Sequence, residues 1–314
     1  MSGKNSMLFH KPLEPMLAVD CPEPFDSGDH LFEVKWDGYR CLAYCDGDVK
    51  LFSRNRKELT SNFPEIAAAL KQMPARCILD GELIAFAADQ RPSFSLLQSS
   101  FKGKAGIATS YAVFDLLYLD DRYLLGLPLV ERRSLLMSAL DGLPPGRVFL
   151  SKAVEGSGIG FFHAVEELNL EGIMAKRKDS VYLPGKRSRA WLKIKRRLET
   201  AAVIVGYVPD PSGFKSLILG QYDQGRLVYV GSVGTGFSQQ DKGILRKGMA
   251  AIESPCPLLD PPAIPGAVWV KPVLAARITY LEYTDTRRLR QASFAGLIPG
   301  AGKEECSVPW QNSL

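Results

Sequence analysis

The sequence contains little histidine and no paired cysteines. Its three histidines, His10, His30 and His163, lie far apart, and none of its six cysteines belongs to a CxxC pair. A structural zinc site needs Cys or His ligands at short spacing, so reduced thiols are expected instead. A catalytic arrangement built on histidine is not expected either. Any chemistry in this chain is therefore predicted to use lysine and acidic side chains.

Long apolar segments are also missing. No run approaches the length of a membrane span, and mean hydropathy is −0.04. Residues 1–15 lack the apolar centre of a secretory signal peptide. With 46% hydrophobic and 23% charged residues, the composition excludes a collagen-like or wholly disordered chain. We expect a soluble, cytoplasmic protein with no membrane partner.

Positive charge is concentrated in two places. The net charge is only +5, but the 22 residues of segment 176–197 include ten Lys or Arg and a single acid, Asp179. A second cluster lies at 287–290, where three of four residues are arginine. Two basic clusters among apolar strand patterns favour a polyanionic partner such as nucleic acid.

Length and patterning predict two domains. A chain of 314 residues exceeds one average domain. Up to about residue 198, short strand patterns alternate with helical ones, which predicts an α+β domain with antiparallel sheets and flanking helices. Beyond it, four or five strands and one helix in about 115 residues suit a small Greek-key barrel such as the OB-fold. We therefore predict domains at 1–198 and 199–314.

The strand patterns at 31–36 and 39–44 are separated by Asp37-Gly38, which indicates a β-hairpin. This turn completes the segment Lys35-Trp36-Asp37-Gly38, which would place an amine at the edge of a sheet. Considered alone, the segment is explained better by a hairpin with an incidental exposed lysine. Further segments follow in order along the chain: Ser53-Arg54-Asn55, Asp80-Gly81-Glu82, Phe114-Asp115, Glu171-Gly172-Ile173 and Trp191-Leu192-Lys193-Ile194-Lys195.

Together, these segments resemble the ordered motifs of the covalent nucleotidyltransferases, the superfamily of ATP-dependent DNA ligases, RNA ligases and mRNA capping enzymes. Within it, the chain is most similar to bacterial stand-alone ligases and the ligase module of bacterial ligase D. The resemblance implies that Lys35 attacks the α-phosphorus of ATP to form lysyl–AMP, while Lys193 and Lys195 stabilise charge on the α-phosphate. Glu171 would hold Mg²⁺ or Mn²⁺; a strand-edge acid that balances nearby basic residues is the alternative.

The same resemblance implies the contacts to ribose, adenine and DNA. Glu82 would accept a hydrogen bond from the ribose, with Arg40 on the opposite side of the sugar. Phe114 would stack on the adenine, and a core phenylalanine is the alternative. Ser53 and Arg54 would bind the 5′-phosphate of the nick. Further members expected at the site are Glu33, for ATP or AMP, and Asp37, Asp80 and Lys176 in supporting positions, although the turn alone explains Asp37.

Strand geometry agrees with these roles. The period of two places Asp80 with Glu82, and Lys193 with Lys195, on common strand faces. Neighbouring lysines supply cations to phosphates, and they would disfavour the charged form of Lys35, which must be neutral to act as a nucleophile.

One segment departs from the superfamily pattern. A C-terminal motif of the RxDK type orients the pyrophosphate leaving group in the superfamily, but segment 294–303 has no matching Arg and Asp. Lys303 would substitute in part. The departure leaves the efficiency of self-adenylation open.

These expectations combine into an ATP-dependent DNA ligase that seals 5′-phosphate/3′-hydroxyl breaks, with an adenylation domain followed by an OB-fold domain. Its cofactors would be ATP and Mg²⁺ or Mn²⁺. Nicked or broken double-stranded DNA would be its partner, and family analogy adds a bacterial Ku-type end-binding protein. We expect a monomer in the bacterial nucleoid, active in DNA repair. The alternatives are an RNA ligase or capping-type nucleotidyltransferase, and a non-catalytic nucleic-acid-binding relative.

Overall fold

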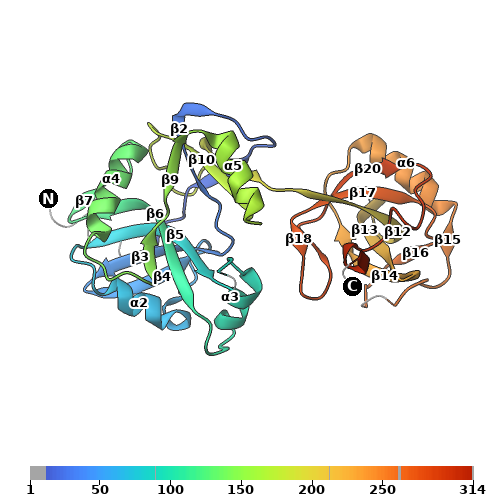
Figure 1. Ribbon diagram of the computed structural model, residues 1–314, viewed down its shortest axis with the longest axis horizontal. Coiled ribbons are helices and arrows are strands. Elements are labelled where there is room, and N and C mark those ends of the chain that lie inside the picture. The colour runs from blue at the N-terminus through green and yellow to red at the C-terminus, as the bar shows by residue number, and fades with distance from the viewer. Residues whose placement is uncertain (1–11, 89, 212, 261–262, 313–314) are drawn as a thin grey trace. The chain divides into compact units, whose positions relative to one another are not determined.

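The computed structural model describes residues 12–88, 90–211, 213–260 and 263–312 (Figure 1). The chain separates into two compact units, 1–196 and 197–314, next to the boundary expected at 198. Residues 1–11, which include His10 and most of the segment compared with a signal peptide, lie outside the described part. Within that part, no helix is both long and apolar enough to cross a membrane.

The first sheet of unit 1 carries the lysine-rich segment, in the strand order β1-β11-β10-β2-β9. Strand β10 is antiparallel to both β2 and β11, so it joins segments that are far apart in the sequence. Helix α5 (Gly158–Glu167) covers one face, where Phe162 packs against Phe32 and Ile173. The strands of this sheet are β1 (Leu17–Asp20), β2 (Ser27–Val34), β9 (Ala153–Gly156), β10 (Gly172–Arg177) and β11 (Arg187–Lys195).

The second sheet of unit 1 has the order β4-β3-β5-β6-β7, and β8 pairs with β6. Helices α2 (Pro64–Leu70), α3 (Phe94–Phe101) and α4 (Leu129–Leu140) pack against its strands, and a 3-10 turn precedes α2 at Thr60–Asn62. Pro64 begins α2, as its fixed φ favours at a first helical position. The strands are β3 (Tyr39–Asp46), β4 (Asp48–Ser53), β5 (Cys77–Ala85), β6 (Thr109–Leu119), β7 (Arg122–Tyr123) and β8 (Val148–Leu150).

The predicted hairpin at Asp37-Gly38 is wrong. Strands β2 and β3 belong to different sheets, so Asp37-Gly38 is a crossover between the two sheets. Gly38 is needed there because a Cβ atom would lie 2.0 Å from the Leu83 carbonyl oxygen on β5. An Asp-Gly pair that indicates a tight turn thus serves a close backbone approach instead.

Unit 2 is built mainly from one strongly bent sheet of seven strands within the described residues. Strands β14-β13-β12-β16-β15 lie in this order, and β17 pairs with both β12 and β20. Helix α6 (Gln239–Ala250) begins with a capping box in which Ser238 and Asp241 bind each other's backbone N–H groups. The strands are β12 (Leu198–Asp210), β13 (Gly213–Asp223), β14 (Arg226–Val233), β15 (Glu253–Ser254), β16 (Val268–Val270), β17 (Ala275–Tyr280) and β20 (Ser293–Ile298).

A separate two-stranded ribbon carries the C-terminal basic cluster. Its strands are β18 (Glu282–Tyr283) and β19 (Leu289–Arg290), with Arg287 and Arg288 in the connection. The core of unit 2 is apolar, with Phe214, Leu217 and Phe294 among its buried members. A 3-10 turn at Pro309–Asn312 ends the described chain.

Candidate active site

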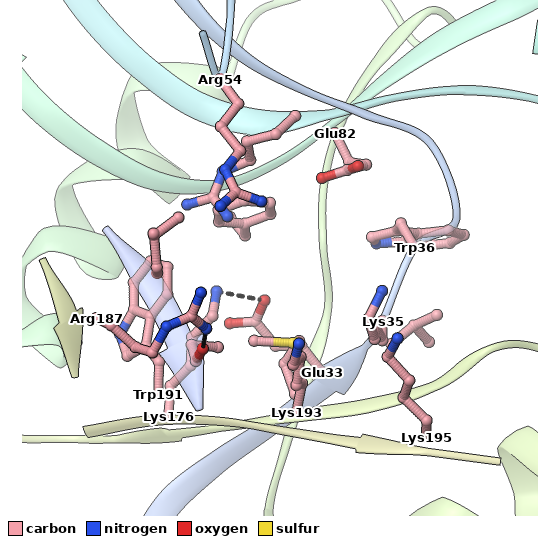
Figure 2. Close-up of a pocket in the computed structure, with 16 residues that line it drawn as sticks. Glu33, Lys35, Trp36, Arg54, Glu82, Lys176, Arg187, Trp191, Lys193 and Lys195 are labelled. Carbon is pink, nitrogen blue, oxygen red and sulfur yellow. Dashed lines mark hydrogen bonds and ion pairs between the residues drawn. The ribbon is translucent and has the colours of Figure 1, made fainter. Parts of the chain in front are cut away.

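A cavity of about 230 Å³ lies between the two sheets of unit 1 (Figure 2). Strands β1, β2, β10 and β11 supply one wall. The opposite wall comes from β3, β5, β6 and the residue that follows β4. Nine of the thirteen residues expected at the site line it: Glu33, Lys35, Arg40, Arg54, Glu82, Phe114, Lys176, Lys193 and Lys195.

Strand register explains why the first wall is so polar. Met174 of β10 lies opposite Glu33 of β2 on one side and Lys193 of β11 on the other. Because side chains alternate along a strand, Glu33 and Lys35, like Lys193 and Lys195, share the cavity face. The residues between them point to the apolar face under α5. The alternation of side chains therefore turns Lys35, Lys193 and Lys195 toward one cavity.

Lys35 and Glu171 meet through main-chain pairing. The Lys35 N–H donates to the carbonyl of Gly172 at 2.9 Å, which extends the β2–β10 pairing beyond the end of β2. Gly172 has φ +143°, and a Cβ there would lie 2.1 Å from the Ile194 carbonyl oxygen. This contact brings the start of β10 tightly against β11. The Lys35 ammonium then forms an ion pair with the Glu171 carboxylate, which is 3% exposed.

The two lysines of β11 have different partners. Lys195 Nζ lies 3.7 Å from Glu171 Oε1, and Lys193 Nζ lies 3.2 Å from Asp20 Oδ2. Burial lowers the pKa of Lys195; the Glu171 carboxylate opposes this effect, while the charges of Lys35 and Lys193 add to it. The positive charges of Lys35 and Lys193 therefore contribute to the lowered pKa of Lys195. Lys35 itself forms an ion pair with Glu171.

Glu33 and Lys176 form a buried ion pair beside the cavity. The Lys176 ammonium donates to Glu33 Oε2 at 2.9 Å, and both side chains are at most 2% exposed. Burial lowers the pKa of Lys176, although the Glu33 carboxylate opposes that effect. The carboxylate of Glu33 is therefore already bound by a cation of the protein, and a direct nucleotide contact from it would have to share this partner.

On the opposite wall, Arg40 is held by Asp80. Its Nε and Nη2 atoms donate to the two carboxylate oxygens at 2.5 and 2.6 Å. The Tyr182 hydroxyl donates to the same carboxylate at 2.6 Å. Burial alone would lower the pKa of Arg40, but the Asp80 carboxylate reverses this and raises it. Asp80, which is fully buried, therefore orients Arg40 from behind the cavity lining.

Glu82 lies directly opposite Arg40 in the β3–β5 register. Burial raises the pKa of Glu82 to about 8, even though Arg40 and Lys35 lower it; the carboxylates of Glu171 and Asp80 raise it further. A carboxyl group that titrates near neutral pH beside a cavity is typical of functional sites.

Phe114 lines the cavity but is only 7% exposed and belongs to an apolar cluster with Tyr182 and Trp191. The Arg40 guanidinium lies 4.6 Å from its ring centroid, and the Lys176 ammonium lies 4.0 Å from it. Both interpretations of this residue, a stacking platform and a core side chain, therefore have a structural basis. Adenine would compete with these cations for contact with the ring.

The two residues expected to bind the 5′-phosphate of the nick, Ser53 and Arg54, lie in different surroundings. Arg54 is exposed and lines the cavity, whereas the Ser53 hydroxyl accepts a hydrogen bond from the Lys57 N–H at 3.0 Å in the turn after β4. Asp37 lies in the crossover and is not part of the cavity lining among the described residues. Lys303, discussed as a partial substitute in the C-terminal motif, lies in unit 2 with its ammonium 5.4 Å from the Tyr222 ring centroid.

Sequence reasoning missed several residues at the cavity. Trp36 and Arg187 line it, and the Trp36 indole donates to the Ser151 hydroxyl at 3.0 Å. Arg187 lies in the basic segment that the sequence already marked, but its position on β11 shows no motif of its own. Tyr182 and Arg133 support the walls from behind, and a one-dimensional pattern carries no signal for such long-range contacts.

No group of three His, Cys, Asp or Glu side chains in the described part of the chain is arranged to bind a metal ion. Glu82 lines the cavity, and Glu171 is ion-paired with two of the lysines that line it, Lys35 and Lys195, without belonging to the lining itself. Mg²⁺ is commonly bound by one or two carboxylates together with substrate phosphates and water. The donor chemistry therefore fits a divalent cation that binds together with a nucleotide.

Known protein families match most of this chain. The ATP dependent DNA ligase domain family matches residues 15–195, and the ATP dependent DNA ligase C terminal region matches residues 210–299. The multifunctional non-homologous end joining protein LigD of Mycobacterium bovis is 34% identical over 301 residues, which are 91% of this chain and 38% of that protein. The chain thus spans well under half the length of this relative.

Two further proteins provide shorter or structural matches. The SPbeta prophage-derived DNA ligase-like protein LigB of Bacillus subtilis is 36% identical over 62% of this chain and 72% of its own length. The structure of mycobacterial DNA ligase D complexed with ATP and MES has a TM-score of 0.58 at 34% identity, covering 94% of this chain and 97% of that one. The predicted α+β class with a C-terminal OB-fold is confirmed. The chain belongs to the ATP-dependent DNA ligase family.

Proposed function

We propose that this chain seals 5′-phosphate/3′-hydroxyl breaks in double-stranded DNA with ATP, through a covalent AMP on Lys35. The observation that carries the proposal is the convergence of Lys35, Lys193 and Lys195 on one cavity. Glu171 forms ion pairs with Lys35 and Lys195 there. A nucleophilic amine beside several cations suits transfer of a phosphoryl group, since its transition state is stabilised mainly by position and charge.

In the first step, the Lys35 amine gives up a proton and forms a P–N bond with the α-phosphorus of ATP, while the bond to pyrophosphate breaks. Lys193 and Lys195 face the same space and stabilise charge on the phosphate. Glu82 and Arg40, on the opposite wall, would contact the ribose. Phe114 would stack on the adenine.

In the next step, a 5′-phosphate oxygen of the DNA attacks the AMP phosphorus and releases the Lys35 amine. The 3′-hydroxyl then attacks the activated 5′-phosphorus, a phosphodiester forms and AMP leaves. Arg54 is the exposed cation at the cavity that would bind the 5′-phosphate, because a guanidinium can donate two parallel hydrogen bonds to it. Ser53 would support the turn that carries Arg54.

Glu171 would hold Mg²⁺ or Mn²⁺ together with phosphate oxygens. Such an ion would neutralise charge on the phosphates. Asp80 and Lys176 act as supports of the walls, and Asp37 as part of the crossover that presents Lys35.

The biological setting is proposed from the relatives. Because LigD relatives are described as non-homologous end joining proteins, we extend a role in bacterial DNA repair, on broken or nicked DNA in the nucleoid, to this chain. A Ku-type end-binding protein would be its partner. We expect the chain to act as a monomer.

The proposal is tested by incubation with Mg²⁺ and ATP labelled at the α-phosphate, followed by a denaturing gel. The wild type should acquire an acid-labile label with ATP but not with GTP, and Lys35→Ala should acquire none. Lys50→Ala, an exposed lysine on β4, is the matched control and should be labelled normally. Covalent AMP on the Lys35→Ala protein would overturn the assignment. Sealing of nicked RNA in preference to nicked DNA would favour the RNA-ligase alternative.

A further inference from the structure

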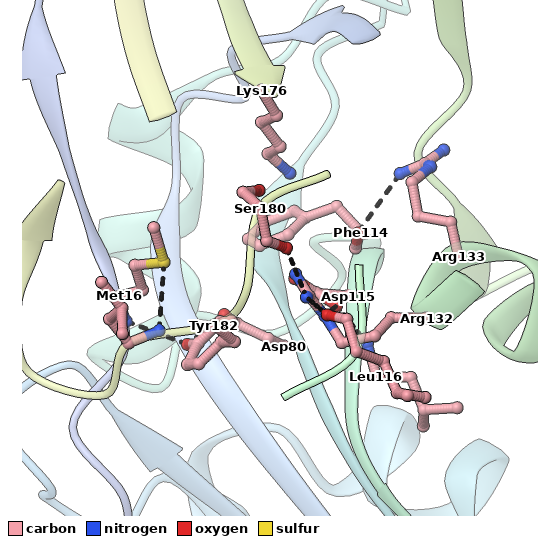
Figure 3. Close-up of polar contacts among 12 residues, drawn as sticks. Met16, Asp80, Phe114, Asp115, Leu116, Arg132, Arg133, Lys176, Ser180 and Tyr182 are labelled. Atoms are coloured by element: carbon pink, nitrogen blue, oxygen red, sulfur yellow. Dashed lines mark hydrogen bonds and ion pairs between the residues drawn. The ribbon is translucent and has the colours of Figure 1, made fainter. Parts of the chain in front are cut away.

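Arg133 lies on α4, outside the segments that carry the family resemblance, yet its guanidinium reaches the back of the cavity wall (Figure 3). Nη1 donates to Glu33 Oε1 at 2.7 Å and to the Phe114 carbonyl at 3.2 Å, and Nη2 donates to the Ser151 carbonyl at 2.8 Å. The side chain is 11% exposed. One guanidinium therefore joins β2, β6 and the segment between β8 and β9.

Glu33 transmits this constraint to the cavity. One carboxylate oxygen binds Arg133, and the other accepts from Lys176, whose ammonium lies against the Phe114 ring. Glu33 cannot turn away without leaving a buried cation unpaired, which is strongly unfavourable. The position of Lys176 at the cavity edge therefore depends on Arg133 through the carboxylate that the two cations share.

Arg133 also acts on Lys176 through its charge. Buried Lys176 and partly buried Arg133 share one buried carboxylate. Burial lowers the pKa of Lys176, Glu33 raises it, and the charge of Arg133 lowers it again. In addition, Ser151, which Arg133 holds by its carbonyl, accepts a hydrogen bond from the Trp36 indole next to Lys35. Removal of Arg133 would thus disturb several parts of the wall at once.

We propose that Arg133 is a positioning residue for the bound nucleotide, acting through Glu33 to hold Lys176 beside Phe114. The inference rests on the proposed use of this cavity for ATP. Arg133 itself lies behind the lining and touches no substrate. Its neighbour Arg132 differs, because it binds Asp115, the Leu127 carbonyl and the Ser180 carbonyl and has no contact with Glu33.

The test is equilibrium binding of α,β-methylene-ATP in the presence of Mg²⁺, measured by calorimetry. This analogue cannot release its leaving group, so binding is separated from covalent transfer. Arg133→Gln should weaken binding about tenfold, which is within the range of coupling between neighbouring charged groups. Arg133→Lys, which retains a cation for Glu33, should remain within about threefold of the wild type. In a Glu33→Gln background, Arg133→Gln should change affinity by less than about twofold, because the carboxylate through which Arg133 acts has been removed.

A purely structural role predicts a different pattern. Arg133→Gln would then lower the unfolding temperature while the folded protein bound the analogue with wild-type affinity, and the proposal would be wrong. Equal losses in Arg133→Lys and Arg133→Gln would assign the effect to the backbone contacts and also overturn it. If Arg133→Gln does not fold, the double-mutant cycle is measured with Arg133→Lys instead. The smaller effect of Arg133→Lys on affinity must then disappear in the Glu33→Gln background. A wild type that binds the analogue but forms no covalent AMP from ATP would contradict the proposed function and leave this inference standing.

Discussion

The two units of the chain differ in what they bury. Within the described residues, the interior of unit 1 contains Glu33, Asp80, Asp115, Arg132, Glu171 and Lys176, whereas the single buried polar side chain of unit 2 is the uncharged Gln221. Buried charges are unfavourable unless they are paired and hydrogen-bonded. Unit 1 satisfies this condition with long-range pairs, and its cavity lies among them.

Unit 2 keeps its charges outside an apolar core. Its arginine cluster at 287–290 lies on the two-stranded ribbon, where the Arg287 side chain is 64% exposed and Arg288 approaches the Tyr229 ring at 4.4 Å. Such a surface can bind a polyanion in a salt-dependent way but offers no enclosed place for group transfer. The comparison teaches that the interior of unit 1 is organised for chemistry, while unit 2 is organised for surface contact.

The largest expected effect comes from breaking a buried pair. Arg132→Ala leaves Asp115 unpaired at 0% exposure and should lower the free energy of unfolding by about 3–5 kcal/mol. The control is Arg277→Ala in unit 2, where Arg277 and its partner Glu199 are 58% and 57% exposed; it should cost at most about 1 kcal/mol. Urea unfolding measures both. Equal losses would remove the distinction between the two units.

Arg54 tests whether a cation at the cavity acts differently from a surface arginine. Arg54→Ala should spare self-adenylation, because no DNA takes part in that step. AMP transfer from the pre-adenylated protein to a nick should fall roughly 10- to 100-fold, since hydrogen bonds to charged groups contribute about 1.5–3 kcal/mol. Single-turnover transfer to nicks with a 5′-phosphate, and binding to nicks with and without it, are measured.

Arg288→Ala in unit 2 is the matched comparison for Arg54. It should weaken DNA binding in a salt-dependent manner, whether or not the nick carries a 5′-phosphate. If Arg54→Ala already fails at self-adenylation, or keeps the wild-type preference for the phosphate, Arg54 is not the phosphate-binding residue. The basic segment at 186–189 would then be the next candidate.

Two buried phenylalanines, one in each unit, distinguish a contribution to nucleotide binding from a contribution to core packing. Phe114→Ala should weaken ATP use by about 1–3 kcal/mol if the ring stacks on adenine. Phe294 of unit 2 is 4% exposed and stacks on Phe237 with ring centroids 4.7 Å apart. Its replacement by Ala should reduce thermal stability with little change in the KM for ATP. A Phe114→Ala protein that loses only stability would support the core interpretation.

A pH dependence of stability is also expected in unit 1. Because the pKa of Glu82 is raised to about 8 by burial, the folded state holds a proton that the unfolded state releases above about pH 4.5. The stability contributed by Glu82 is therefore complete below that pH and is lost as the pH rises towards 8. The loss cannot exceed about 1.4 kcal/mol per pH unit.

The measurement is the difference between wild type and Glu82→Gln in urea unfolding from pH 5 to 8.5. The wild type should lose stability relative to this variant as the pH rises. Gln221→Ala in unit 2 serves as the control, because Gln221 is neutral and hydrogen-bonded to Thr200 and Tyr283; its difference from wild type should be flat with pH. A flat profile for Glu82→Gln would mean that this carboxyl group is ionised throughout.

Much of the local structure could be predicted. Alternation placed Lys193 and Lys195 on one strand face, which in the structure is the face that lines the cavity. The Asp37-Gly38 prediction failed because a glycine required by a nearby carbonyl is indistinguishable in sequence from one required by a turn. Helix α3 (Phe94–Phe101) was not anticipated, and its N-terminal cap, Ser93, is a common residue that gives little signal by itself.

By itself, the sequence determined the residue types of the site, their order and the strand faces on which they lie, because these depend on spacing over a few residues. Only the tertiary structure decided which strands became neighbours, and hence that Lys35 meets Glu171 across 136 positions of the chain. It also decided that Glu33 is shared by Arg133 and Lys176. Such pairings arise where the burial of a charge must be balanced by an opposite charge, wherever in the chain that partner lies.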